Sequence, residues 1–377
     1  LNSCLYCAFR KDNPLIRRRR LSQDEIAEET TALLKGGHKR VLLVASEHGS
    51  GKDGEADYYV DSIKTIYSTE WKGNKVRRIN INCAPLSESG FRKLKASGIG
   101  TYQLFQETYH EETYRKMHVS GPKSDPDNRI DAIDRAFRAG IDDVGIGVLY
   151  GLYDHRFDTL ALLSHVEYLE HTFGVGPHTI SVPRLEPALG VDFNETAPYK
   201  VSDEDFRKLV AVLRLSVPYT GIILSTRETP EMRDELFRLG ISQVSAASRT
   251  SPGGYSEEAE PGDDAQFFLS DHRSLDEVIE SLMDRGAVPS FCTACYRKER
   301  TGEAFMKLAR PGTIKGKCAM NALITLREYL DDFASETVKA KGYALIEKLK
   351  AELSEEEKKN LEKFFEHIKK GLRDEHV

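Results

Sequence analysis

Short apolar runs alternate with amphipathic helical patterns from residue 21 to about residue 285. The helical patterns repeat apolar positions at three- and four-residue spacing, whereas the runs between them are continuous and bounded by turn residues. Continuous runs of this kind are typical of strands buried on both faces of a parallel sheet. The pattern predicts seven strands, at 41–46, 76–82, 102–107, 144–150, 179–183, 220–225 and 243–247.

Helix boundaries are marked by capping residues. Ser22-Gln-Asp-Glu25 is a capping box, and the helix that it opens should end at Gly36-Gly37. Further barrel helices are predicted at 127–139, 156–172 and 203–216, and glycines that suit helix C-termini stand before three of the strands, at Gly98, Gly140 and Gly240.

Strands alternating with helices predict an α/β fold with a parallel sheet. A cysteine loop at the start of the chain would follow one more strand upstream of Leu1, which gives the eight strands of a closed (β/α)8 TIM-type barrel. An open partial barrel is the alternative. We expect this barrel to span 1–288, truncated at its N-terminus. A polar loop is expected at 248–273, where loops of such length are usually functional or disordered.

The sequence after Pro289 has a different character. It is rich in Lys and Glu, and apolar residues recur at helical spacing over 321–333 and 335–349, followed by a final helix capped by Ser354. We therefore expect a C-terminal helical domain at 289–377.

Composition narrows the class of protein. The chain has 377 residues, of which 40% are hydrophobic and 30% charged, as in ordinary globular proteins. No apolar run is long enough for a membrane span, and a net charge of −6 gives no reason to expect a nucleic-acid partner. The six cysteines do not suggest a disulfide framework in a chain this long, so a reducing, cytoplasmic, metal-handling setting is expected.

Two cysteine motifs carry the candidate chemistry. Cys292-Thr-Ala-Cys295 is followed after 22 residues by Cys318, and three thiolates suit an iron–sulfur cluster with one open iron better than a closed zinc site. Cys4-Leu-Tyr-Cys7 looks like the end of a C-x3-C-x2-C loop whose first cysteine would precede Leu1. An isolated redox-active or structural C-x2-C pair is the alternative.

Charged residues follow several predicted strands, where ligands gather in a barrel. Glu47 could hold an amino group and Glu107 could accept hydrogen bonds from a ribose or substrate, although a solvated acid and a structural ion pair are the simpler alternatives. Arginines fit carboxylates bidentately, so an anionic ligand is expected in the barrel mouth. These arginines are Arg184, Arg227 and Arg249, and each alone could equally be an ion-paired framework residue. Glu186, Ser225 and Ser248 stand at the same strand ends.

His178 opens a predicted strand, so it belongs to the opposite end of the barrel. A neutral imidazole there could bind iron, although a lone histidine is often only structural.

These residues together resemble the radical S-adenosylmethionine (SAM) superfamily, and within it the tyrosine lyases of FeFe-hydrogenase maturation. The resemblance covers nearly the whole chain. It rests on Asn-Ser-Cys-Leu-Tyr-Cys (2–7), Leu-Leu-Val-Ala-Ser-Glu-His (42–48), Leu-Phe-Gln-Glu-Thr-Tyr-His (104–110), Gly-Ile-Asp-Asp-Val-Gly-Ile-Gly (140–147), Val-Gly-Pro-His-Thr-Ile-Ser-Val-Pro-Arg (175–184), Ile-Leu-Ser-Thr-Arg-Glu (223–228) and the C-terminal cysteine motif.

The resemblance implies two iron–sulfur clusters. The first, a 4Fe–4S cluster on Cys4, Cys7 and the upstream cysteine, would bind SAM and generate a 5′-deoxyadenosyl radical that cleaves L-tyrosine to p-cresol and dehydroglycine. The second would stand on Cys292, Cys295 and Cys318 with an extra iron, where carbon monoxide and cyanide form. Implied roles are cofactor binding for Tyr6, Glu47, Glu107 and Arg184, tyrosine binding for Ser225, Arg227 and Arg249, and an extra-iron ligand for His178.

The same resemblance implies several partners: a free cysteine on the auxiliary cluster, hydrogenase-maturation proteins and an electron donor. Two thiolates alone should hold the SAM cluster poorly, so we expect tyrosine cleavage only if the given sequence is a fragment of a longer chain. Two alternatives remain at this point. One is another radical lyase of aromatic amino acids, of the thiazole-biosynthesis type, and the other is a non-catalytic iron–sulfur or zinc carrier.

Overall fold

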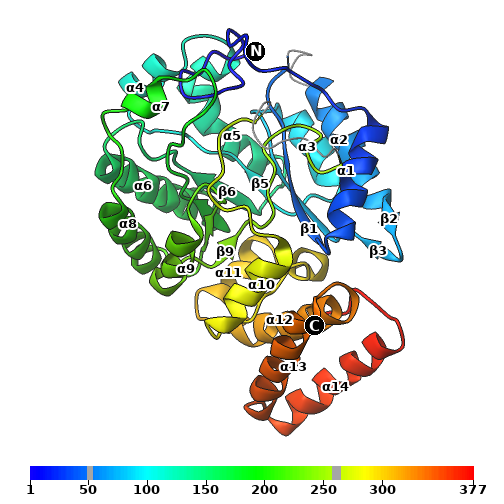
Figure 1. Cartoon of the computed structure of the whole chain (residues 1–377). Helices are drawn as coiled ribbons and strands as arrows, with labels where there is room; N and C mark the ends of the chain where they lie inside the picture. Colours follow the sequence, from blue (N-terminus) through cyan, green and yellow to red (C-terminus); the bar gives the residue numbers. More distant parts are fainter. Residues whose placement is uncertain (49–53, 257–264) are drawn as a thin grey trace.

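One parallel sheet organises the N-terminal three quarters of the chain in this computed structural model, which describes residues 1–48, 54–256 and 265–377 (Figure 1). Each strand pairs in parallel with the next along the chain, in the order β1-β4-β5-β6-β7-β8-β9. The strands are β1 (Arg40–Val44), β4 (Arg78–Asn82), β5 (Tyr102–Gln103), β6 (Val144–Gly147), β7 (Thr179–Ser181), β8 (Gly221–Leu224) and β9 (Gln243–Val244). The seven predicted strands are therefore confirmed, with shorter ends.

Helices connect the strands and cover the outer face of the sheet (Figure 1). They are α1 (Gln23–Lys35), α2 (Gly54–Ser68), α3 (Glu88–Ala96), α4 (Glu111–Met117), α5 (Pro126–Arg138), α6 (His155–Phe173), α7 (Phe193–Thr196), α8 (Asp203–Ser216) and α9 (Pro230–Leu239), with a 3₁₀ turn at Pro122–Ser124. The predicted capping box is present at the start of α1, where Glu25 N–H donates to Ser22 Oγ and Ser22 N–H donates to Glu25.

The sheet is a partial barrel within the described residues. Its edge strands β1 and β9 share no backbone pairing, but Arg40 Nη2 donates to Gln243 Oε1 across the gap at 3.0 Å. Leu42 and Val44 on β1 are 46% and 59% exposed, which is unusual for an apolar strand of a barrel. The α/β class and the parallel sheet are confirmed, and the open partial barrel that the sequence left as an alternative describes this sheet.

A large apolar core lies between the sheet and its helices. It includes Ile79 and Ile81 of β4, Ile180 of β7 and Ile222 of β8, all fully buried. Glycines on β6 allow close approach inside the barrel, because a Cβ on Gly145 would lie 2.4 Å from Thr179 Oγ1. The core thus fixes the strands whose ends carry the candidate site.

The C-terminal helices pack at the end of the barrel opposite the N-terminus (Figure 1). They are α10 (Leu275–Asp284), α11 (Gly302–Ala309), α12 (Ile314–Asp332), α13 (Glu336–Ala351) and α14 (Glu355–Lys369), with a 3₁₀ turn at Cys295–Lys298. A second apolar core joins α10 to α12, α13 and α14, so α10 packs with the helices that follow the boundary expected at residue 289. The division into two domains at that residue stays a prediction.

Three details differ from the sequence pattern. A short hairpin, β2 (Glu70–Trp71) and β3 (Asn74–Lys75), was not predicted. Helix α12 begins at Ile314, seven residues before the predicted start, and so includes Cys318. The predicted loop at 248–273 contains neither helix nor strand at 248–256 and 265–273, and its middle lies outside the described residues.

Candidate functional site

A cavity of about 1860 Å³ runs through the interior of the partial barrel. Cys4 and Cys7 line it at one place, and Cys292, Cys295 and Cys318 line it at another. The N-terminal loop lies at the carboxyl ends of the strands, where Leu1 N donates to Glu47 O just beyond β1. The second cysteine motif lies at the amino ends, since Arg78 at the start of β4 contacts Cys292. The two motifs therefore face one cavity from opposite ends of the sheet.

The Cys4–Cys7 loop is held by backbone pairing with the segment after α4. Ser3 N–H donates to Ser120 O at 3.0 Å, and Leu5 N–H donates to Met117 O at 2.9 Å. Cys4 is only 5% exposed, and burial raises the pKa of its thiol. Soft thiol donors on a fixed loop suit iron, because thiolates are the ligands of iron–sulfur clusters.

The Tyr6 side chain is fixed by a buried histidine. Tyr6 Oη lies 2.9 Å from His118 Nε2, while His118 Nδ1 lies 2.7 Å from Tyr114 O. Burial, aided by the Lys123 charge, lowers the pKa of His118 to about 3, so the ring is neutral. Its Nδ1 proton must then go to the Tyr114 carbonyl, and Nε2 accepts from the Tyr6 hydroxyl. Asn194 Nδ2 also donates to Tyr6 O at 3.0 Å, so both ends of Tyr6 are held.

Glu107 is the centre of a buried ion cluster beside the loop. Its Oε1 lies 2.6 Å from Lys123 Nζ and 3.1 Å from Arg129 Nη2. Burial alone would raise the pKa of this carboxyl, but the two cations lower it to about 2. Glu107 also has a φ of 72°, a left-handed conformation that a non-glycine residue adopts at a cost. Glu107 therefore stays ionised, and two cations share its charge.

Glu47 faces the same end of the cavity. Its carboxylate accepts a hydrogen bond from Asn2 Nδ2, and its carbonyl accepts one from the Leu1 amino group. The strand end after β1 is therefore tied to the cysteine loop, which places a carboxylate close to the loop as the sequence predicted for a ligand amino group.

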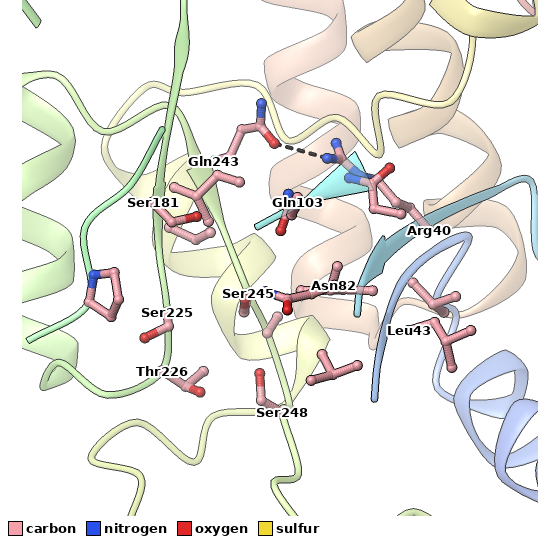
Figure 2. A pocket seen from close by; sticks show the side chains of 18 of the residues that line it. Arg40, Leu43, Asn82, Gln103, Ser181, Ser225, Thr226, Gln243, Ser245 and Ser248 are labelled. Atoms are coloured by element: carbon pink, nitrogen blue, oxygen red, sulfur yellow. Dashed lines mark hydrogen bonds between the residues drawn. The ribbon is translucent and has the colours of Figure 1, made fainter. Parts of the chain in front are cut away.

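Polar side chains line the middle of the cavity (Figure 2). Asn82 of β4, Gln103 of β5 and Ser181 of β7 point inward, together with Ser225, Ser245 and Ser248 from the ends of β8 and β9. The interior of an ordinary (β/α)8 barrel is filled by branched apolar residues. Short polar side chains instead leave room and hydrogen-bonding groups for a small polar molecule.

Arg227 and its neighbours form the wall after β8. The Arg227 guanidinium lies 3.5 Å from the centre of the Phe267 ring, and its Nη1 donates to Arg184 O at 3.3 Å. Ser225 Oγ accepts from Arg227 N–H at 3.3 Å. Burial lowers the pKa of Arg227 to about 10, so it remains a cation at neutral pH. Arg249 lines the same cavity, with its N–H donating to Tyr255 Oη.

Arg184 is placed differently from the other predicted arginines. Its Nε donates to Glu228 Oε1 at 2.9 Å and its Nη1 to Asp203 Oδ1 at 2.7 Å, while the guanidinium lies 4.6 Å from the Phe206 ring centre. These partners form a small surface groove between α8 and α9. Arg184 is not among the described residues that line the large cavity, so a role in cofactor binding stays a prediction without a contact that supports it.

The second cysteine motif is held against the amino ends of the strands. Cys292 has a φ of 51°, and Arg78 Nη1 donates to its carbonyl at 3.4 Å. Cys295 begins the 3₁₀ turn, and burial together with the Cys292 thiol raises its pKa. Cys318 is exposed on α12, and partial burial of its thiol raises its pKa to about 11, with smaller contributions from Cys292 and Cys295.

His178 stands at this same end of the cavity. Its Nδ1 lies 3.5 Å from Asp143 Oδ2, and Arg78 Nη2 lies 3.1 Å from the same oxygen. The centres of the His178 and Phe305 rings are 4.4 Å apart. Burial lowers the pKa of His178 to about 4, so the imidazole is neutral. A carboxylate beside Nδ1 favours the tautomer that leaves Nε2 free to bind a metal.

The thiol and imidazole donors at the two ends are of types that bind iron, but in this structure they are not grouped around one point. Within the described part of the chain, no group of three or more His, Cys, Asp or Glu residues has the spacing of a metal site. Residues that the sequence did not rank also belong to the site: His118, Lys123 and Arg129 surround the cysteine loop. Basic residues 16 and 22 positions after Glu107 give no local pattern, so only the fold shows their role.

Known proteins resemble this chain in both sequence and fold. A model of the radical SAM superfamily matches residues 1–163, and a model of the biotin and thiamin synthesis associated domain matches residues 181–288. The 2-iminoacetate synthase of Escherichia coli (strain K12) is 35% identical over 292 residues, which are 76% of this chain and 73% of that protein.

Two crystal structures of HydG, a maturase of FeFe-hydrogenase, share the whole architecture. One is 47% identical with a TM-score of 0.95 and covers 100% of this chain and 81% of that chain. The other, from Carboxydothermus hydrogenoformans, is 44% identical with a TM-score of 0.83 and covers 97% and 79%.

The fold, the cysteine loop and these likenesses define the class: the chain belongs to the radical SAM superfamily, whose members use a 4Fe–4S cluster and SAM. Within that class it is a HydG-like enzyme, of the tyrosine lyase type to which 2-iminoacetate synthase is also close. The resemblance drawn from the sequence motifs is thus confirmed. No helix among the described residues has the length and apolar character needed to cross a membrane.

Proposed function

We propose that this protein cleaves L-tyrosine between Cα and Cβ and converts the small product to carbon monoxide and cyanide at an auxiliary iron–sulfur cluster. The product of such a pathway would be an iron carbonyl-cyanide unit for the active-site cluster of FeFe-hydrogenase. The observation that carries the proposal is the cavity with thiols at both ends. The likeness to HydG over the whole chain supports the assignment.

The two reactions need no oxidant, because the external electron donor would supply the electron that, with a proton, replaces in p-cresol the hydrogen atom removed from tyrosine. Tyrosine contains the atoms of p-cresol plus dehydroglycine, and dehydroglycine contains those of carbon monoxide, hydrogen cyanide and water. The second fragment is small and polar, and the serine and amide side chains between the two ends can hydrogen-bond to it (Figure 2).

At the carboxyl ends of the strands, called the upper end here, Cys4 and Cys7 would hold the SAM cluster. This cluster supplies the radical that removes a hydrogen atom from the amino group of tyrosine. Tyr6 and Glu47 would contact the SAM molecule, and Glu107 would hold the loop or a ribose hydroxyl. Arg227 would bind the tyrosine carboxylate, with Ser225 and Arg249 beside it. Their common position on the cavity wall supports these roles.

At the amino ends of the strands, called the lower end here, Cys292, Cys295 and Cys318 would hold the auxiliary cluster. His178 would bind the extra iron of that cluster through Nε2. The neutral imidazole beside Asp143 supports this role. A free cysteine on this cluster, an external electron donor and hydrogenase-maturation proteins complete the proposal.

The test begins with anaerobic reconstitution with iron and sulfide, for the chain itself and for a form extended by one cysteine before Leu1. With tyrosine, SAM and a reductant, the reconstituted enzyme should release p-cresol and cyanide. Cresol without cyanide would favour a lyase of the 2-iminoacetate synthase type, whose E. coli member is 35% identical to this chain. Zinc at about one per chain, with no brown absorbance, would rule out both lyases.

Variants then separate the two ends. Cys292→Ser should keep cresol formation and lose cyanide, whereas Cys83→Ala, which changes a buried cysteine outside both motifs, should keep both products.

His178→Ala should keep cresol formation and reduce iron-bound carbon monoxide, measured by infrared spectroscopy. Its buried imidazole lies beside Asp143, which Arg78 links to Cys292 at the amino ends of the strands. An equal loss of cresol and carbon monoxide would contradict the role given to His178.

A further inference from the structure

Glu186 is an acidic side chain on the cavity wall that has no ion-pair or hydrogen-bond partner among the described residues. Glu186 follows β7 and lines the cavity, two residues after Arg184. Within the described residues its carboxylate makes no hydrogen bond or ion pair, although its backbone carbonyl accepts from Asn194 Nδ2. The neighbouring Glu228 is already paired with Arg184. A half-buried carboxylate that the protein leaves unpaired is available to a ligand.

Arg227 is a cation on the same cavity wall that likewise has no ion-pair partner among the described residues. Arg227 follows β8, the strand next to β7, and lines the same cavity. Its guanidinium packs on Phe267 and donates to a carbonyl, but no carboxylate of the described chain lies within ion-pair distance of it. Glu186 and Arg227 follow these two paired strands and line the same cavity, but they form no ion pair with each other.

An α-amino acid carries an ammonium and a carboxylate on one carbon, and it would fit between an unpaired anion and an unpaired cation. We propose that Glu186 binds the ammonium group of the amino-acid substrate while Arg227 binds its carboxylate. This inference rests on the proposed function, since it takes tyrosine as that amino acid. It adds a substrate-binding residue to those that the sequence motifs indicate.

Glu186 is also suited to receive a proton from its ligand. Burial, followed by the charge of Glu228, raises the pKa of this carboxyl to about 7. Removal of a hydrogen atom from the substrate nitrogen is easier from a neutral amine than from an ammonium. Transfer of one proton from the ammonium nitrogen to a Glu186 oxygen produces that amine and a neutral carboxylic acid, and no electron moves. Glu186 would therefore orient the amino group and prepare it for reaction.

SAM carries the same pair of groups on its methionine part, so it is the second possible ligand. The Glu47 carboxylate is tied to the cysteine loop by its hydrogen bond from Asn2, so we assign it rather than Glu186 to the SAM ammonium. Glu186 instead belongs to the wall with Arg227, Ser225 and Phe267. An aromatic ring beside the paired charges favours tyrosine as the ligand.

The experiment compares two ligands that differ only in the amino group: L-tyrosine and 3-(4-hydroxyphenyl)propionate. Binding to the cluster-free protein is measured by titration calorimetry at pH 8, with SAM as a third ligand. The unchanged protein should bind tyrosine at least about tenfold more tightly than the amine-free analogue, because a charge-assisted pair is lost. Glu186→Gln should abolish that preference, and Glu186→Asp should keep part of it.

Glu195→Gln is the matched control, since Glu195 is an exposed acid on the nearby helix α7 that does not line the cavity. It should leave all three affinities unchanged, and equal melting temperatures of the variants would show that each is folded. A tenfold preference retained by Glu186→Gln would overturn the inference, and so would a loss confined to SAM binding. If the unchanged protein binds tyrosine no better than the analogue, the tyrosine assignment itself fails.

Discussion

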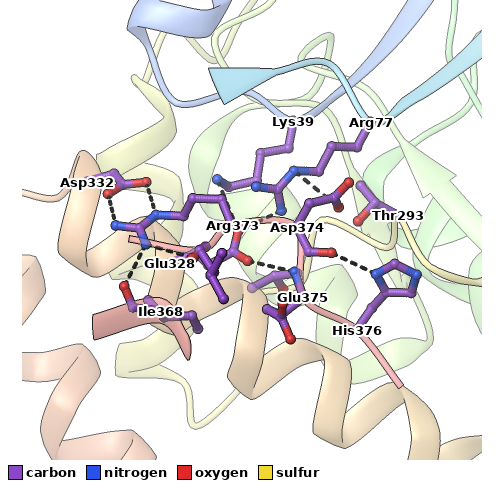
Figure 3. Close-up of polar contacts among 12 residues, drawn as sticks. Lys39, Arg77, Thr293, Glu328, Asp332, Ile368, Arg373, Asp374, Glu375 and His376 are labelled. Atoms are coloured by element: carbon purple, nitrogen blue, oxygen red, sulfur yellow. Dashed lines mark hydrogen bonds and ion pairs between the residues drawn. The ribbon is translucent and has the colours of Figure 1, made fainter. Parts of the chain in front are cut away.

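Each end of the barrel holds one buried carboxylate between two cations, but the two clusters connect different parts of the chain. At the upper end Glu107 pairs with Lys123 and Arg129, which are 16 and 22 residues away. At the lower end Glu328 of α12 lies 2.6 Å from Arg77 Nη1 and 3.5 Å from Lys39 Nζ, across a separation of 251 residues from Arg77 (Figure 3).

The difference indicates what each cluster stabilises. The upper cluster is local and surrounds the cysteine loop, so it shapes a binding site. The lower cluster joins the start of β4 to α12 and to the last residues described, through the 3.3 Å contact between Arg77 Nε and Asp374 Oδ1 (Figure 3). It therefore fastens the C-terminal helices, and the Cys318 that they carry, to the barrel.

The largest effect is expected at the lower cluster. Glu328→Gln would leave Lys39, at 2% exposure, without its carboxylate partner, and would leave Arg77, at 6% exposure, with only the half-exposed Asp374. Removal of one partner from such a buried set costs roughly 3–5 kcal/mol. Urea denaturation should show this loss, with the C-terminal helices released first.

The control for that variant is Glu336→Gln, whose ion pair with Lys339 is 92% exposed on the glutamate side. It should change the free energy of unfolding by less than about 0.5 kcal/mol. Equal effects of the two substitutions would show that the lower cluster does not fasten the helices.

The cluster around Glu107 should make the free energy of unfolding depend on pH. The pKa of Glu107 is about 2 in the folded protein against an ordinary value of 4.5. Its contribution, about 3 kcal/mol from that difference, is fully present above pH 4.5 and is lost as the pH falls toward 2. Denaturation curves of Glu107→Gln should lack this acid-dependent loss. A variant that destabilises as steeply with acid as the unchanged chain would contradict the assignment.

A smaller effect is expected from the hydroxyl of Tyr6. Tyr6→Phe removes the hydrogen bond to His118 Nε2 and leaves a buried acceptor unsatisfied, at a cost of about 1–2 kcal/mol. The substitution should also loosen the cysteine loop, measured as faster alkylation of Cys7. Tyr168→Phe, on the outer face of α6, is the control, and it should leave the alkylation rate unchanged.

Local sequence patterns determined most of the fold. Strand and helix positions followed from short-range periodicity, and the capping boxes at Ser22 and Ser354 are both formed as predicted. The hairpin β2–β3 was missed because strands of two residues have no period, although Lys72-Gly73 adopts the left-handed turn conformation that such hairpins need. The C-x2-C motifs could also be recognised from the sequence, because the paired cysteines of each motif are only three residues apart.

Only the tertiary structure decided which charged residues face the cavity. Arg184 and Arg227 both follow strands and look equivalent in sequence, yet Glu228 and Asp203 pair with Arg184 in a surface groove, while Arg227 lines the cavity. Glu186 is left unpaired by the same arrangement. Charges act over a few ångströms in space regardless of sequence separation, so a pattern along the chain names the candidates but cannot tell which of them are already paired.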